Sequence, residues 1–332
     1  MTTPVPAAAT GPCRLAADHQ RDMHAPKPAA KAPGFSLVNQ PYLLLSLTSL
    51  FWASNIIVGR HVVGQIPPVT LSLIRWGGAF LLVLPLAWPH LKQDGPVIRR
   101  HLGILLLLSI TGITAFNTMA YWALEYTQAL NGLLLQSSTP LFVAVWSLIL
   151  LGARLTLAQA LGVLVSMAGV ITILLRGDLG ALAAIEFNRG DVIFVIAFAI
   201  FGFYTTLSVK SPPIHALSFL AFTFGCGGAF LIPFVVWEIA AGRVMVVNAE
   251  SVLAAAYIVV FPATLAYFCY NRGIQLIGAN RAAPFSHLIP VFGSIMAIGL
   301  LGEEARLFHL VGYALVFSGV IVAARAPAQR KA

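Results

Sequence analysis

The feature that most constrains this chain is a series of long apolar runs joined by very short polar connections. Each run is close to the ~20 residues that an α-helix needs to cross the ~30 Å hydrocarbon core of a bilayer. Only 9% of the residues are charged and 59% are hydrophobic, whereas a soluble domain carries about 25% charged residues. These values exclude a soluble fold and predict an all-α membrane protein.

Ten of the apolar runs are long enough to be transmembrane helices. We predict these helices near residues 42–63, 69–88, 102–124, 128–151, 155–175, 191–209, 215–237, 251–270, 279–301 and 306–324. Short connections such as Gly152-Ala153-Arg154 leave no room for a soluble domain between neighbouring helices. Residues 1–40 are rich in Ala and Pro and contain no apolar core of a signal peptide, so we expect a disordered cytoplasmic tail there. Residues 326–332 are expected to form a second, shorter cytoplasmic tail.

The distribution of Lys and Arg predicts the orientation. With the N-terminus inside the cell, five basic residues fall in outer connections: Arg60, Arg176, Arg189, Arg243 and Arg306. Thirteen fall on the inner side: Arg14, Arg21, Lys27, Lys31, Lys92, Arg99, Arg100, Arg154, Lys210, Arg272, Arg325, Arg330 and Lys331. Because cytoplasmic loops carry an excess of Lys and Arg, both termini are predicted to be cytoplasmic.

The chain matches itself at an offset of 150 residues. Pro140 falls on Pro290, Gly169 falls on Gly319, and the pair at 77–78 falls on the Gly-Gly pair at 227–228. Common residues can coincide by chance, but here glycines and a proline agree in one register. The offset divides the chain into repeats at 41–176 and 190–325 with five helices each. Because five is odd, the second repeat enters the membrane from the opposite side. The predicted fold is therefore ten transmembrane helices as an inverted 5+5 structural repeat, which is typical of secondary transporters.

Several motifs resemble a known family. They are Trp52-Ala53-Ser54-Asn55, Tyr121-Trp122-Ala123-Leu124, and Pro140, Gly152, Gly162 and Gly169 with their partners Pro290, Gly302-Glu303, Gly312 and Gly319. Over residues 42–324 these motifs resemble the EamA-type repeat of the drug/metabolite transporter superfamily, and aromatic amino-acid exporters of the YddG type are the most similar. The resemblance implies an exporter in the bacterial cytoplasmic (inner) membrane. The first repeat departs from it, because Gly152-Ala153 stands where the family often has Gly-Glu.

Polar and aromatic residues deep in the predicted helices are the candidates for substrate binding. A polar side chain in hydrocarbon is costly unless it has a partner, so it indicates either helix packing or a polar cavity. The predicted substrate-binding residues are Trp52, Asn55, Asn117, Gln136, Ser137, Tyr204, Tyr267, Ser286 and His287. His287 could couple transport to protons, but a neutral hydrogen-bonding role is favoured. Arg75 is close enough to a helix end to reach the interface, and we expect it to be an anchor.

Three prolines inside predicted helices are expected to bend them: Pro140, Pro262 and Pro290. A proline lacks an N–H and leaves a carbonyl one turn earlier unpaired. Pro140 should therefore free the carbonyl of Gln136, and Pro290 that of Ser286. Either the substrate or neighbouring helices could use these carbonyls.

The residue types that are missing narrow the function. No Asp or Glu lies at the centre of a predicted span, which disfavours lipophilic cations as substrates. There is no phosphate-binding loop, no cysteine spacing typical of a metal site and no basic, aromatic-rich patch for nucleic acid. Adjacent helical residues point about 100° apart, so Ser286 and His287 do not form a catalytic dyad, and an intramembrane enzyme is disfavoured.

We therefore predict a secondary transporter, not an enzyme, that exports small neutral or zwitterionic metabolites. Aromatic and other hydrophobic amino acids are the expected substrates. The alternative within the same superfamily is an exporter of drugs or other amphipathic metabolites. The expected partners are the substrate and the lipid bilayer. We expect no metal and no cofactor, and a monomer as the assembly.

Overall fold

The computed structural model describes Met1 and residues 37–62, 64–123, 125–127, 129–178, 180, 188–301 and 304–326. Apart from Met1, these residues belong to one compact unit, Leu37–Ala332. Most of the two predicted tails, and the Gly302-Glu303 motif, lie outside the described residues. The end of the predicted first tail contains a 3-10 helix, η2 (Leu37–Asn39), which Arg272 holds by donating hydrogen bonds to the Val38 carbonyl and the Asn39 side chain.

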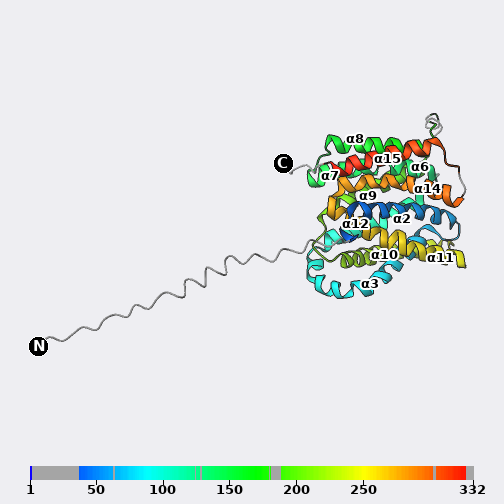
Figure 1. The fold of residues 1–332 in the computed structure, drawn as a ribbon. Helices are drawn as coiled ribbons and strands as arrows, with labels where there is room; N and C mark the ends of the chain where they lie inside the picture. Colours follow the sequence, from blue (N-terminus) through cyan, green and yellow to red (C-terminus); the bar gives the residue numbers. More distant parts are fainter. Residues whose placement is uncertain are drawn as a thin grey trace. The chain divides into compact units, whose positions relative to one another are not determined.

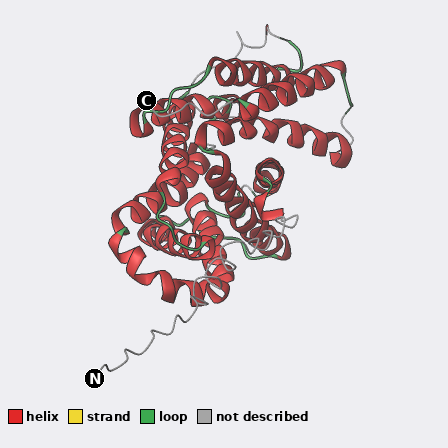
Figure 2. Ribbon diagram, turned by 60° about the vertical axis from the view of Figure 1, so that its left-hand side comes forward, coloured by secondary structure: helices red, strands yellow, loops and turns green. Residues whose placement is uncertain are grey.

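All regular structure in the described residues is helical, as Figure 2 shows. The longer elements are α2 (Pro41–His61), α3 (Pro68–Arg100), α4 (Leu102–Leu108), α5 (Phe116–Ala123), α6 (Ala129–Gln136), α7 (Thr139–Leu151), α8 (Leu157–Leu174), α9 (Arg189–Leu207), α10 (Ala216–Ala240), α11 (Ala249–Ile258), α12 (Ala266–Ile277), α14 (Leu288–Leu301) and α15 (Leu307–Arg325). Alone or joined to their neighbours, these elements provide eight helical segments long and apolar enough to cross a membrane. The predicted all-α membrane class is therefore confirmed.

Two helices extend beyond the ends that the apolar pattern predicts. The second helix was expected to end at residue 88, but α3 continues to Arg100. The eighth was expected to end at residue 270, but the helix continues to Ile277. In both cases the added residues include polar ones, such as Lys92 and Arg272. Polarity marks where a chain leaves the hydrocarbon, but it does not interrupt backbone hydrogen bonding, so the helix continues into the interface.

Two long helix pairs form opposite sides of the unit, α8 with α15 and α3 with α10 (Figure 1). A Cβ atom added to Gly169 would lie 2.7 Å from the carbonyl oxygen of Gly312, and one added to Gly162 would lie 2.6 Å from that of Gly319. These glycines let the backbones of α8 and α15 touch, as small residues do in membrane helix pairs.

The pair α3 and α10 is antiparallel, as its two ends show. At one end the His90 ring stacks on the His215 ring with 3.6 Å between centroids. At the other end the buried Glu238 carboxylate accepts hydrogen bonds from the backbone N–H groups of Val69 and Thr70, at 3.2 and 2.7 Å. Glu238 therefore satisfies the free donors at the start of α3.

Four of the described helical segments contain an irregular stretch. Two π-helical stretches, η3 (Ser109–Ala115) and η6 (Val259–Leu265), lie between α4 and α5 and between α11 and α12. The α6–α7 segment is interrupted at residues 137–138, and a short helix, α13 (Ala279–Ala282), with the 3-10 helix η7 (Ala283–His287), precedes α14. π-helical turns are rare and often occur at functional sites.

The three predicted bending prolines lie at or beside these stretches. Pro262 is inside η6. Pro140 and Pro290 are not in the middle of continuous helices, as the sequence suggested, but in the first turns of α7 and α14, directly after the interruptions. Proline is tolerated in a first helical turn because the N–H groups there have no helical partner.

Candidate functional site

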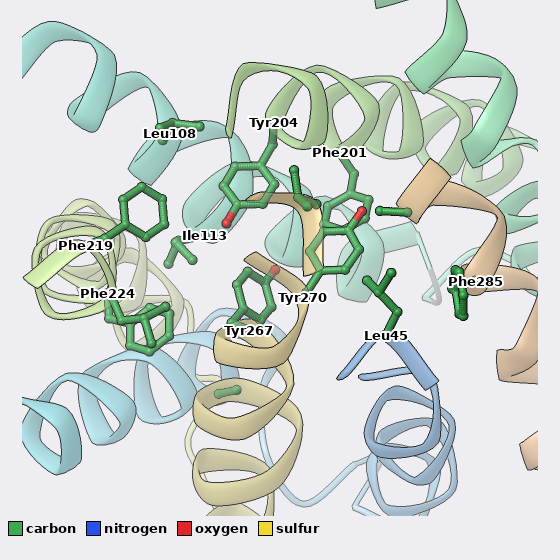
Figure 3. Packing of buried hydrophobic residues seen from close by; sticks show 14 of the residues in the cluster. Leu45, Leu108, Ile113, Phe201, Tyr204, Phe219, Phe224, Tyr267, Tyr270 and Phe285 are labelled. Atoms are coloured by element: carbon green, nitrogen blue, oxygen red, sulfur yellow. The ribbon is translucent and has the colours of Figure 1, made fainter. Parts of the chain in front are cut away.

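Six large aromatic residues meet at the centre of the unit and form what we call the aromatic cluster: Trp52, Trp76, Phe201, Tyr204, Tyr267 and Tyr270. Trp52 comes from α2, Trp76 from α3, Phe201 and Tyr204 from α9, and the other two from α12. Figure 3 shows the tyrosine rings and Phe201 facing one another between these helices. Ring centroids lie 4.8 Å apart for Trp76 and Tyr267 and 5.0 Å apart for Trp52 and Tyr270. The predicted residues Trp52, Tyr204 and Tyr267 therefore do lie together.

Each tyrosine hydroxyl in the cluster has a buried polar partner. Tyr204 donates to the Asn271 side chain at 2.8 Å, and the Tyr270 hydroxyl lies 2.8 Å from that of Thr205. Tyr267 donates to the carbonyl of Gly112 at 2.9 Å and accepts from Asn117 at 3.3 Å. Gly112 lies in η3, so the predicted pair Asn117 and Tyr267 meets beside a π-helical turn. Satisfied hydroxyls of this kind give a closely packed apolar centre a few oriented polar groups.

A second group of predicted residues lines one narrow space, which we call the His287 crevice: Gln136, Ser137, Ser286 and His287, with Leu133, Val170 and Pro290. The imidazole Nε2 lies 2.8 Å from the carbonyl oxygen of Ser137, and Nδ1 lies 2.6 Å from the Ser166 hydroxyl. Because a carbonyl only accepts, Nε2 must carry a hydrogen, and in the neutral ring Ser166 donates to Nδ1. The crevice is too narrow for a water-sized sphere.

Asn55 makes neither set of contacts. It lies about one helical turn after Trp52 on α2, and its side-chain oxygen is buried without a hydrogen-bond partner. The residues predicted as one substrate site are therefore found in two groups, the aromatic cluster with Asn117 and the His287 crevice, with Asn55 outside both.

Sequence reasoning misplaced Arg75, which was expected to reach the membrane interface. Its side chain is instead buried, with 3% exposure. The guanidinium donates to the Tyr121 hydroxyl at 3.0 Å and to the carbonyl oxygen of Pro262 at 3.1 Å. The Trp52 indole donates to the same carbonyl at 3.2 Å. Distance from a helix end does not reveal which neighbouring helices cover a side chain, but a lone arginine in an apolar run was itself a signal of function.

Two carboxylates are buried in the described residues, and both have partners near helix ends. Asp191, at the start of α9, accepts hydrogen bonds from the Thr127 hydroxyl at 2.6 Å and from the Asn131 amide at 3.2 Å. Glu238 accepts from the start of α3. Within the described part of the chain, no group of three or more His, Cys, Asp or Glu residues is placed to hold a metal ion.

The fold and its polar centre define a multi-pass membrane protein. The chain belongs to the EamA-like transporter family, which matches it twice, at residues 39–175 and 188–325. The family membership expected from the motifs is thus confirmed, and transmembrane transport is the activity of this class.

Individual relatives are distant but extend over most of the chain. An uncharacterized transporter of Bacillus subtilis, YyaM, is 27% identical over 85% of this chain and 92% of its own length. A probable terminal-alkyne amino-acid exporter of Streptantibioticus cattleyicolor is 23% identical over 84% of this chain and 91% of its own length. A solved crystal structure has the same fold, with a TM-score of 0.68 at 18% identity, over 86% of this chain and 97% of that one.

Proposed function

We propose that this transporter exports small neutral or zwitterionic metabolites, above all aromatic and other hydrophobic amino acids. The observation that carries the proposal is the aromatic cluster, in which large rings and a few oriented polar groups come from four helices. Binding sites for small molecules are mostly apolar, with a small number of placed polar groups. The Streptantibioticus relative, whose name describes an amino-acid exporter, is consistent with this substrate class.

We propose further that the chain forms ten spans in an inverted 5+5 repeat, with boundaries near 41–176 and 190–325. The 21-residue helix α2 and the segment Ala279–Leu301 would complete the ten. The irregular stretches support this arrangement, since η3 and η6 begin 150 residues apart, at Ser109 and Val259.

Two contacts between equivalent residues support the same repeat. Asn117 donates to Tyr267, and His287 contacts the carbonyl of Ser137, and the members of each pair are 150 residues apart. In a two-fold arrangement, a residue can touch its own equivalent only close to the symmetry axis. Both contacts would therefore mark the axis, where secondary transporters with inverted repeats bind substrate.

Alternating access would follow from movement of the halves about this axis. The packed aromatic cluster and the narrow His287 crevice fit a conformation in which the path is closed. Opening would use the irregular stretches at Pro140, Pro262 and Pro290, because interrupted helices bend more easily than regular ones. The unpartnered oxygen of Asn55 would then be available as an acceptor for a substrate amino group. The positive-inside pattern assigns both termini to the cytoplasm of a bacterial cell, with the protein in its inner membrane.

The contacts of the polar residues argue against the two alternatives, an intramembrane enzyme and an exporter of drugs. Ser286 donates to the Ala283 carbonyl, and His287 contacts Ser166 and Ser137, so these neighbours do not form a nucleophile–base pair. Export of lipophilic cations would need a carboxylate free to exchange a proton for the drug. The buried Asp191 and Glu238 are instead committed to backbone and side-chain donors at helix ends.

The test is flux through purified protein in liposomes, measured for Phe, Trp, Thr and a quaternary ammonium dye with and without a pH gradient. We expect Tyr267→Ala and Gln136→Ala to lower amino-acid flux while expression persists. Tyr313→Ala and Gln275→Ala, which change the same residue types outside the two groups, should keep it. Full flux in both site variants would remove the assigned site, and dye flux without amino-acid flux would replace the substrate class.

A further inference from the structure

Arg75 is the only Lys or Arg among the residues that the structure describes as buried. Among the described residues, no carboxylate lies within ion-pair distance of its charge, since the ion pairs found there, Arg243 with Glu125 and Arg306 with Glu304, lie elsewhere. Taking a charge out of water costs several kcal/mol unless an opposite charge and good hydrogen bonds offset the loss. A buried arginine without a counter-charge therefore requires an explanation.

The partners of Arg75 are neutral, and they do not satisfy all of its N–H donors. One terminal nitrogen donates to the Tyr121 hydroxyl and the other to the Pro262 carbonyl, while the buried Nε–H has no hydrogen-bond partner in the part of the chain that the structure describes. The guanidinium carbon lies 4.7 Å above the Trp76 ring. A guanidinium has five N–H donors arranged to match a carboxylate with two parallel hydrogen bonds. That match is unused in this conformation.

The location of Arg75 also fits a ligand. Its partners come from α5 and η6, which lie in the two different segments matched by the family. Trp52 shares the Pro262 carbonyl with Arg75, and Trp76 lies beneath the guanidinium; both belong to the aromatic cluster. A positive charge therefore lies beside an aromatic surface, where two parts of one substrate could bind together.

We propose that Arg75 binds the carboxylate of the substrate, while the aromatic cluster receives its side chain. In the conformation described, the Tyr121 hydroxyl and the Pro262 carbonyl hold the guanidinium. When the helices separate, the carboxylate replaces these neutral acceptors and supplies the missing negative charge. This inference rests on the proposed function and narrows it, because it requires a carboxylate and makes the amino group secondary. Amines and amides with the same ring would be poor substrates.

The experiment compares acids with their amides in matched pairs. Flux into proteoliposomes is measured for phenylalanine against phenylalaninamide and for 3-phenylpropanoate against 3-phenylpropanamide. Ligand-induced shifts in melting temperature of the purified protein are measured for the same four compounds. The wild type should prefer at least one acid over its amide by about 10-fold or more, as loss of a hydrogen-bonded charge predicts.

Two substitutions at Arg75 test whether it supplies this preference. Arg75→Gln should abolish the preference for the acid. Arg75→Lys should retain part of it, since an ammonium keeps the charge but lacks the planar fork. The matched control is Arg243→Gln, which removes an exposed arginine from an ion pair and should behave as the wild type. A merely structural arginine would lower the melting temperature without changing the ratio of acid to amide.

The outcomes separate this inference from the proposed function. If phenylalanine is not transported, but 3-phenylpropanoate is preferred over its amide through Arg75, amino-acid export is wrong and the carboxylate site stands. A wild type that prefers neither acid, or a folded Arg75→Gln variant that keeps the preference, overturns the site. If Arg75→Gln does not fold, an unchanged acid preference in Arg75→Lys overturns it instead.

Discussion

His287 joins three parts of the chain through two hydrogen bonds. Its ring contacts the Ser137 carbonyl at the α6–α7 interruption and the Ser166 hydroxyl on α8. Neither partner carries a charge. This geometry is what a neutral imidazole needs, with one nitrogen donating and the other accepting.

The first prediction follows from that geometry. His287→Ala removes the donor to the buried Ser137 carbonyl and should lower the free energy of unfolding by about 1–3 kcal/mol. His287→Gln keeps an amide donor and should recover most of the stability. Thermal unfolding of the purified variants measures both. If the ring acts only as a neutral bridge, His287→Gln should also keep the wild-type dependence of flux on pH between about pH 5 and 8.

The opposite result is as informative. Ser294→Ala serves as the control, because it removes a partly buried hydroxyl from the contact with Tyr313 without touching His287. A His287→Gln protein that is stable but has lost its pH dependence would make His287 the proton carrier and would contradict the neutral bridge.

At the residue scale, sequence predicted some neighbours well and missed others. Depth along each span brought Trp52, Tyr204 and Tyr267 into one set, and the structure places their rings together. The sequence could not show the division into two groups, because depth gives a position along a helix but not the direction a side chain faces. The sequence also did not predict the contact between Tyr121 and Arg75. Both residues lie near helix ends, and depth along a helix does not show that other helices cover those ends.

At the scale of elements, α8 and α15 pack with their backbones in direct contact. A Cβ atom on Gly319 would lie 2.4 Å from the backbone nitrogen of Ser166 and 2.5 Å from the carbonyl oxygen of Gly162. Both atoms belong to the backbone of α8 and cannot move away independently of that helix. An added methyl group on Gly319 must therefore push the two helices apart.

The second prediction compares two Gly→Ala substitutions inside helices. Gly319→Ala should lower the melting temperature by several degrees, because overpacking typically costs about 1–3 kcal/mol. Gly293→Ala, in α14, places the new methyl group where no atom outside its chain neighbours and the surrounding helix backbone lies within 4 Å. It should be neutral or stabilising by up to about 1 kcal/mol, since alanine favours helix more than glycine does. Equal effects of the two substitutions would show that α8 and α15 are not in close contact.

The existence of the helices was predictable, but their irregularities were not. Apolar length predicted each of the eight segments that are long and apolar enough to cross a membrane. It could not reveal η3 and η6, since π-helical turns depend on how a helix packs and have no composition of their own. It also put Pro140 and Pro290 in the middle of helices, because the prolines are visible in sequence while the interruption before each of them is made of ordinary residues, such as Ser137 and His287.

At the scale of the whole molecule, the 150-residue offset is the sequence feature that relates the two halves of the chain. It was read from Gly and Pro positions. The same interval separates the starts of the two π-helical stretches, and it separates the two members of each contact between equivalent residues. The sequence could not predict those contacts, because an offset relates two positions without giving the distance between them. Only the fold shows which equivalent positions are in contact.

The third prediction tests whether the repeat is inverted. Gln93 is exposed on α3, at the end where His90 stacks on His215, and Ala241 is exposed directly after α10, at the end that holds Glu238. Ala241 lies within two residues of the repeat equivalent of Gln93. An inverted repeat puts these positions on opposite sides of the membrane, whereas a parallel repeat puts them on the same side.

The measurement is labelling of intact cells with a membrane-impermeant maleimide. Gln93→Cys and Ala241→Cys are made separately in a background in which Cys13, Cys226 and Cys269 are replaced by Ser. We expect Ala241→Cys to react in intact cells and Gln93→Cys to react only after permeabilisation. The cysteine-free background is the control for non-specific labelling. The reverse pattern would put the N-terminus outside while keeping the inversion, and reaction of both positions from the same side would rule the inverted repeat out.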